Sequence, residues 1–204
     1  METKKVAGNK KKARKEERTI VFIDESGLSE RPFVVRTWAP RGETPILQYH
    51  FNWKQLAAIA GVSWYNIFFK LYPGTIKQEE IVDFLGHLLR YLKGKVLVVW
   101  DGLRAHHGRV VKKYIDSTEG RLCLEFLPAY APELNPVEYL WGYWKMRELP
   151  NFCATDYAEL SEAALRGLHR IRVRLCQITK FTSSSCVWGG CYSSTHHENH
   201  RVQG

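Results

Sequence analysis

The sequence lacks any apolar run as long as a membrane span, and its first residues are charged where a secretory signal would be apolar. It also has few cysteines: five, an odd number, without paired spacing in the body of the chain. These absences exclude a transmembrane protein and argue against a disulfide framework. We therefore expect a soluble protein of the reducing cytoplasm, with no membrane partner.

Acidic side chains are in the minority, because 30 Lys and Arg against 21 Asp and Glu leave a net charge of +9. The basic excess lies near the two ends of the chain, which favours a polyanionic partner and most simply nucleic acid. Charge alone fits an ordinary solvated surface equally well. The side chains expected on a DNA backbone are Lys11, Lys12, Arg14, Lys15, Arg166, Arg170, Arg172 and Arg174.

Length and composition favour one packed domain with irregular ends. Residues 1–18 are lysine-rich with almost no large apolar side chain, and residues 181–204 have no hydrophobic period and many small polar residues. Both segments are predicted to be disordered tails around a single domain at 19–180.

Short apolar runs and helical periods alternate along this domain. Strands are predicted at 19–24, 33–40, 55–64, 66–74, 95–100 and 121–128, with the second to fourth added antiparallel to the first. A helix is predicted from a capping box formed by Thr75 and Gln78, with its apolar stripe running from Ile81 to Leu92. Further helices are predicted at about 108–117, from Asn135–Pro136 onward, and at about 156–175. This order predicts an α/β fold with a mixed sheet covered by helices.

Two of the buried strands each finish on an aspartate, Asp24 and Asp101. If these strands are neighbours, both carboxylates project into one crevice. Glu138, behind three prolines at the start of a helix, is the candidate third acid. Three clustered carboxylates suit Mg²⁺ or Mn²⁺. Glu25 competes with Asp24, but strand alternation places it on the opposite face.

Each acid also has a structural interpretation. Asp24 and Asp101 are ordinary residues for the end of a strand. The stretch from Asn135 to Glu138 reads as a capping box with Pro136 at the first helical position, which requires no metal. Trp141, on the same helix, is expected to pack in the core rather than stack on bases.

Three motifs resemble a known family: "VFIDESGL", "LVVWDGLRAHH" and "LPAYAPELNPVEYLWGYWK". Together they look like the catalytic half of bacterial insertion-sequence transposases of the mariner-like superfamily, close to insertion-sequence family 630. The resemblance implies a ribonuclease H-like fold with a mixed five-stranded sheet flanked by helices. It also implies a DDE endonuclease domain in which Asp24, Asp101 and Glu138 bind two Mg²⁺ or Mn²⁺ ions, with His106 and Asn135 as auxiliary residues.

The implied activity is metal-dependent DNA strand cleavage and strand transfer, on transposon ends and target DNA at the nucleoid. The sequence departs from the family in lacking an N-terminal helix-turn-helix ahead of the first catalytic strand. Expected partners are therefore DNA, a second copy of the chain, and a separate helix-turn-helix protein from an upstream reading frame. The alternatives are a truncated, inactive remnant that binds DNA without specificity or acts as a regulator, and a host nuclease of the same fold.

Overall fold

The structure is a computed structural model that describes residues 16–49, 55–102, 104–128 and 134–184. Most of the two predicted tails, including Lys11, Lys12, Arg14 and Lys15, lies outside the described residues. The described parts reach into both segments: the Arg18 guanidinium donates to the Gly120 carbonyl at 3.0 Å, and residues 181–184 continue the last helix. The predicted domain bounds stay predictions.

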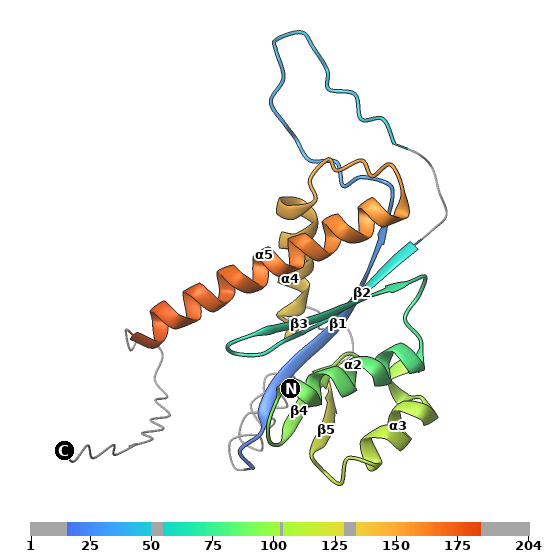
Figure 1. Cartoon of the computed structure of the whole chain (residues 1–204), viewed down its shortest axis with the longest axis vertical. Coiled ribbons are helices and arrows are strands. Elements are labelled where there is room, and N and C mark those ends of the chain that lie inside the picture. Colours follow the sequence, from blue (N-terminus) through green and yellow to red (C-terminus); the bar gives the residue numbers. More distant parts are fainter. Residues whose placement is uncertain (1–15, 50–54, 103, 129–133, 185–204) are drawn as a thin grey trace, which may run out of the picture.

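A mixed five-stranded sheet forms the centre of the molecule, in the order β3-β2-β1-β4-β5 (Figure 1). The antiparallel part joins β1 to β2 and β2 to β3, whereas β4 and β5 run parallel to β1. The predicted mixed sheet is confirmed. The strands are β1 (Thr19–Ser29), β2 (Gln55–Val62), β3 (Ile67–Pro73), β4 (Val96–Trp100) and β5 (Leu122–Phe126).

The first strand is longer than predicted, because it does not end at Asp24 but runs to Ser29. Its two edges behave differently. The parallel ladder with β4 stops at the pair Phe22↔Val99, while the antiparallel ladder with β2 continues to Ser29↔Gln55. Asp24 therefore lies within a strand, at the point where β4 has left it.

The strand predicted at 33–40 is wrong. Phe33 makes one isolated bridge to Pro150, and residues 34–40 have no regular structure. Val34 and Trp38 are 77% and 99% exposed, so their β-favouring side chains find no neighbouring strand to pack on. The segment belongs to a long loop that projects beyond the rest of the molecule (Figure 1).

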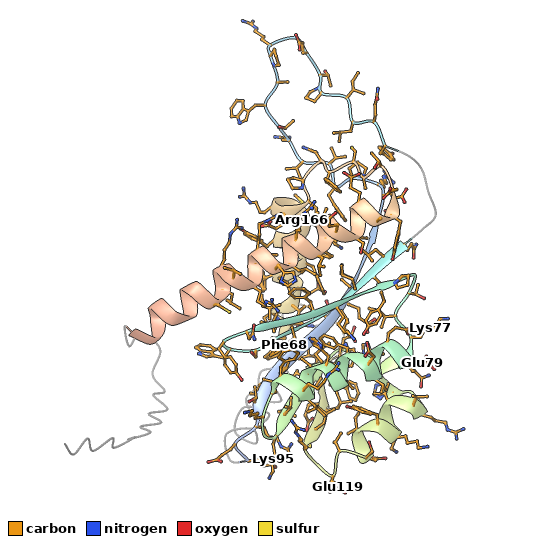
Figure 2. All side chains as sticks on the ribbon, in the orientation of Figure 1. Phe68, Lys77, Glu79, Lys95, Glu119 and Arg166 are labelled. Carbon is orange, nitrogen blue, oxygen red and sulfur yellow. The ribbon has the colours of Figure 1, made fainter. Side chains whose placement is uncertain are left out.

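Helices cover both faces of the sheet (Figure 1). On one face lie α2 (Gln78–Tyr91) and α3 (Arg109–Asp116); on the other lie α4 (Val137–Tyr143), which continues into a π-helical turn (Trp144–Glu148), and the long α5 (Tyr157–Ser184). The predicted cap of α2 is wrong by two residues. The Lys77 backbone N–H donates to Glu80 at 2.9 Å, so α2 begins after Lys77, which Figure 2 labels at the start of this helix.

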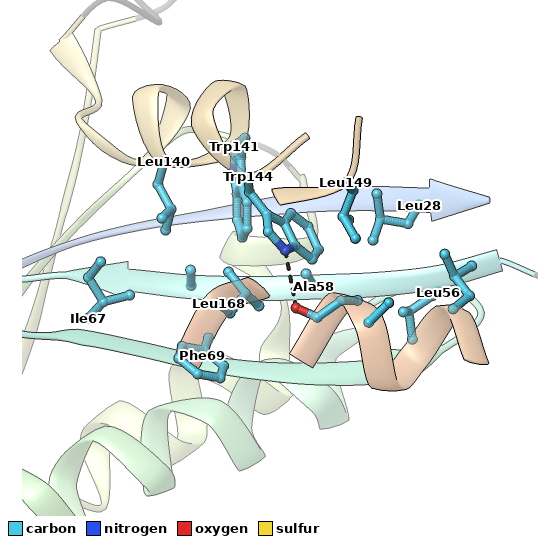
Figure 3. Close-up of a cluster of buried hydrophobic side chains, with 14 of the residues drawn as sticks. Leu28, Leu56, Ala58, Ile67, Phe69, Leu140, Trp141, Trp144, Leu149 and Leu168 are labelled. Atoms are coloured by element: carbon cyan, nitrogen blue, oxygen red, sulfur yellow. Dashed lines mark hydrogen bonds between the residues drawn. The ribbon is translucent and has the colours of Figure 1, made fainter. Parts of the chain in front are cut away.

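Two separate hydrophobic clusters stabilise the two faces. The cluster under α4 and α5 contains Trp141, Trp144 and Leu168, and the Trp144 indole donates to the Ala164 carbonyl at 3.1 Å (Figure 3). The cluster under α2 contains Phe84 and Trp100. In the described part of the chain, no helix combines the length and apolar character that a membrane crossing requires.

Gly61 permits close packing within the second cluster. A Cβ atom at this position would lie 2.9 Å from Val21 Cγ1 and 3.5 Å from Phe84 Cζ. We expect Gly61→Val to lower the free energy of unfolding by about 1–3 kcal/mol, because the added methyl groups overpack a filled core. Urea unfolding followed by circular dichroism measures this change.

Gly27→Val is the matched control, because Gly27 lies on the exposed part of β1 and a Cβ there meets nothing within 4 Å. An equal loss of stability in both variants would contradict the packing explanation.

Candidate active site

The register between β1 and β4 places two acids at the same level of the sheet. Phe22 pairs with Val99 in the parallel ladder, and Asp24 and Asp101 each follow two residues later. The register therefore brings both residues to the level at which the strands separate, and the sharing of one crevice by their carboxylates stays a prediction. Their charges interact, since Asp101 contributes to the raised pKa of Asp24.

Asp24 has a defined environment on the α4 face of the sheet. Its Oδ2 accepts a hydrogen bond from the Trp141 indole at 2.8 Å. The pKa of Asp24 is raised to about 6, chiefly by burial and to a smaller extent by the charges of Glu138 and Asp101, against the lowering effect of the bonds from Trp141 and the Glu25 backbone N–H. Three acids thus share one electrostatic site. The sequence indicated Trp141 only as a core residue and missed its bond to Asp24.

Asn135 fixes the start of the helix that carries Glu138. Its side chain is 3% exposed; Nδ2 donates to the Ile23 carbonyl at 3.0 Å and Oδ1 accepts from the Val137 N–H at 3.2 Å. Asn135 thereby ties α4 to β1 one residue before Asp24. The predicted capping box is wrong: the Asn135 side chain accepts from Val137 and not from the Glu138 N–H, and within the described residues the exposed Glu138 carboxylate makes no bond to the Asn135 backbone.

His106 lies between two acids. Its Nδ1 is 2.7 Å from Asp101 Oδ1, and its Nε2 is 3.1 Å from Glu25 Oε1. Burial would lower the pKa of His106, but the bonds to Asp101 and Glu25 outweigh it and raise the pKa to about 9. The ring is therefore charged at neutral pH, with both nitrogens engaged. Glu25 lies on the opposite face from Asp24, as predicted, but it belongs to the surroundings of the site through this bond.

The chemistry of the donors fits a divalent cation, although in the described residues no three acidic, histidine or cysteine groups are yet close enough to hold one. The pKa of Asp24 is raised mainly by burial, and the charges of Glu138 and Asp101 add to the rise. Carboxylate oxygens are the ligands that Mg²⁺ and Mn²⁺ prefer. The residues that could hold a metal are Asp24, Asp101 and Glu138.

A lysine that the sequence did not single out also lies at the site. Burial lowers the pKa of Lys145, against the opposing influence of Glu138 and Asp24. Its Nζ lies 5.2 Å from the centroid of the Phe33 ring. Lys145 therefore supplies a partly buried positive charge within electrostatic range of two of the three acids.

The arginines predicted on a DNA backbone already have protein partners. Arg170 and Arg174 each lie 2.6 Å from one carboxylate, that of Glu148, whose side chain is 4% exposed. Arg166 pairs with Glu162 at 2.5 Å, and Arg172 lies over the Phe69 ring and contacts His169. The pairs on Glu148 join α5 to the π-helical turn behind α4, a role that the sequence did not reveal.

Comparison with known proteins supports this architecture. The family model described as "DDE superfamily endonuclease" matches residues 19–160, more than half of the chain. A search of the curated proteins found no match. Three solved structures share the fold of this chain: the Mos1 strand transfer complex, with 19% identity and a TM-score of 0.54, the Mos1 mariner paired end complex with Mn, with 20% and 0.55, and the mariner Mos1 paired end complex with Mg, with 18% and 0.55.

The chain spans only part of these proteins. The matches cover 91%, 83% and 90% of this chain, but 60%, 57% and 61% of the Mos1 chains, in the same order. At such identities the likeness shows the fold alone. It confirms the predicted ribonuclease H-like architecture.

The raised pKa of Asp24 makes stability depend on pH. The Asp24 carboxyl group binds its proton more tightly in the folded chain than in the unfolded chain. Asp24 therefore contributes most to the free energy of unfolding below pH 3.8, and this contribution is lost as pH rises to about 6. In a chelating buffer, we expect the stability of Asp24→Asn relative to the unchanged chain to rise by about 1–3 kcal/mol between pH 4 and pH 7. Urea unfolding at each pH measures it.

Asp116→Asn, at the exposed end of α3, serves as the control for this series. If the difference in free energy of unfolding between Asp24→Asn and the unchanged chain stays constant from pH 4 to pH 7, the pKa of Asp24 is not raised by folding.

The buried carboxylate of Glu148 predicts a stability effect at α5. Replacing both Arg170 and Arg174 by Leu should lower the free energy of unfolding by about 1–3 kcal/mol, because a buried charge loses its partners. Adding Glu148→Leu should recover part of this loss. Arg166→Leu, which removes an exposed pair, should change stability by about 0.5 kcal/mol or less. Thermal and urea unfolding measure all three variants. If Arg166→Leu lowers the free energy of unfolding as much as the double replacement of Arg170 and Arg174 does, the pairing with Glu148 does not stabilise α5.

Proposed function

Because the chain belongs to the DDE superfamily endonuclease family, we propose that it is a transposase catalytic domain that cleaves DNA strands and transfers them to a target. The observation that carries this proposal is the β1–β4 register, which brings Asp24 and Asp101 to the same level of the sheet, together with the influence of Glu138 on the pKa of Asp24. We propose that these three acids are the catalytic residues. The Mos1 strand transfer and paired end complexes, which share the fold, support the reaction class by analogy.

We propose that the three carboxylates hold two Mg²⁺ or Mn²⁺ ions. When bound, such ions activate an attacking hydroxyl and stabilise the leaving oxygen of a phosphodiester. The Mos1 paired end complexes with Mn and with Mg support this choice of cation. Glu138 is exposed on the first turn of α4, so closing the set requires a movement of its side chain toward Asp24.

The chain's own groups prepare the acids for this role. Trp141 directs Asp24 through the bond to Oδ2, and Asn135 holds the helix of Glu138 against β1. His106 is engaged on both ring nitrogens, so it orients its neighbours rather than carrying a proton to or from DNA. In this proposal the attacking hydroxyl belongs first to water and then to the freed 3′ end of the DNA, without a covalent enzyme intermediate.

DNA is the proposed partner. Arg170 and Arg174 neutralise Glu148. The better candidates on α5 for phosphate contacts are therefore Arg166, whose pair with Glu162 is exposed, and Arg172, which contacts Phe69 and His169. A homodimer and a separate helix-turn-helix protein stay predictions, which the mass of the complex on a transposon-end duplex would test.

The proposed reaction predicts metal-dependent nicking. We expect the chain to convert supercoiled plasmid to the nicked form with Mg²⁺ or Mn²⁺ and not with EDTA. Asp24→Asn, Asp101→Asn and Glu138→Gln should each lower the rate by about a hundredfold or more, because each removes a ligand of ions that supply several kcal/mol to the transition state. Gel electrophoresis of time courses measures the rates.

Asp116→Asn keeps the same chemistry far from the site and should nick at the unchanged rate. Nicking that survives in all three site variants would refute the assignment of the acids. DNA binding without any nicking in either metal would instead favour an inactive DNA-binding remnant, and nicking that is indifferent to transposon ends would favour a host nuclease of the same fold.

A further inference from the structure

Glu25 directly follows Asp24 in the sequence but is not one of the three proposed catalytic acids. Its side chain lies on the other face of the sheet, is 22% exposed, and meets His106 Nε2 at 3.1 Å. The neighbouring strand supplies the acid at the other end of the same imidazole, Asp101. One ring therefore connects a residue of β1 with a residue that follows β4.

His106 is held as a rigid spacer. The residue is 2% exposed, and its ring stacks on Trp100 with centroids 3.8 Å apart and an interplanar angle of 26°. Its Nδ1 contacts both the carbonyl oxygen of Asp101, at 3.1 Å, and the carboxylate Oδ1, at 2.7 Å. A bond from one donor to the backbone and side chain of the same residue fixes that side chain's rotation.

Asp101 needs such support more than Asp24 does. Its side chain is 39% exposed, and it is followed by Gly102, which is exposed and where an added Cβ would meet nothing within 4 Å. Asp24, by contrast, lies inside a paired strand and is fixed by Trp141. A site binds its metal more weakly when a ligand at the start of a loop is not held in position by hydrogen bonds from surrounding residues.

We infer that Glu25 is a positioning residue that acts through His106 to fix the orientation of the Asp101 carboxylate. Glu25 accepts from Nε2–H, which sets the angle of the ring, and the ring directs Nδ1–H to Asp101. The consecutive residues Asp24 and Glu25 thus support the site from both faces of the sheet. Asp24 is itself one of the proposed metal ligands, and Glu25 orients another, Asp101, through His106. This inference rests on the proposed function, which makes Asp101 a metal ligand.

Binding of Mn²⁺ to the full chain, followed by electron paramagnetic resonance, tests the inference. Glu25→Leu removes the acceptor and should raise the Kd for Mn²⁺ about tenfold, as losses of outer contacts do. Glu25→Gln keeps an oxygen acceptor for Nε2–H and should restore most of the affinity. Glu79→Leu, on the exposed first turn of α2 (Figure 2), is the matched control and should bind as the unchanged chain does. Glu25→Ala replaces the Leu variant if that variant does not fold.

Two outcomes of this titration overturn the inference. One is unchanged affinity in Glu25→Leu. The other is equal weakening in the Gln and Leu variants, because a lost negative charge and not a lost acceptor would then be responsible.

A second readout separates this inference from the proposed function. Proton–nitrogen spectra of the imidazoles without metal should show both His106 N–H protons protected from exchange in the unchanged chain, and neither protected in Glu25→Leu. If no chain binds Mn²⁺ but these spectra change as expected, the metal proposal fails and the positioning role stands. If the Nδ1–H stays protected in Glu25→Leu, Asp101 is held without Glu25 and the inference fails.

Discussion

The parallel pairing of β1 with β4 is the constraint on which the site depends. Its register carries Asp24 and Asp101 to the same level, and the separation of the strands just beyond Phe22 and Val99 opens room between them. A shift by one residue would turn every β4 side chain to the other face. The apolar runs that bury these strands on both sides therefore also determine whether the two carboxylates meet.

Gathering acids at that junction has an electrostatic cost, which the surroundings offset unequally. Burial and the neighbouring acids disfavour the ionised form of Asp24 and raise its pKa to about 6. Asp101 has a charged imidazole beside it, and Lys145 lies near Asp24 and Glu138. The cations that the chain itself supplies are therefore a histidine bonded to Asp101 and a lysine within electrostatic range of Asp24 and Glu138.

Much of this arrangement could be predicted from the sequence, because the strongest signals are local. Continuous apolar runs ending in Asp24 and Asp101 identified the two strands, and Asn135–Pro136 identified the start of α4. The strand expected at 33–40 was wrong because side-chain type cannot show whether a partner strand is present. Alternation placed Glu25 on the far face, but its bond to His106 depends on the path of the loop after β4, and the partner of the Trp141 indole depends on how α4 packs. Neither leaves a periodic signal.

The contact of Trp141 with Trp144, whose rings lie 5.5 Å apart, has a consequence for how such a gene can change. Trp144 is bonded to Ala164 of α5, and Trp141 is bonded to Asp24, so a chain of two indoles links the C-terminal helix to the first acid. A nonsense mutation or frameshift ahead of α5 would spare all three acidic codons and still remove the partner of Trp144, which packs beside the indole that is bonded to Asp24. Intact acids in a shortened copy therefore do not show that their surroundings are intact.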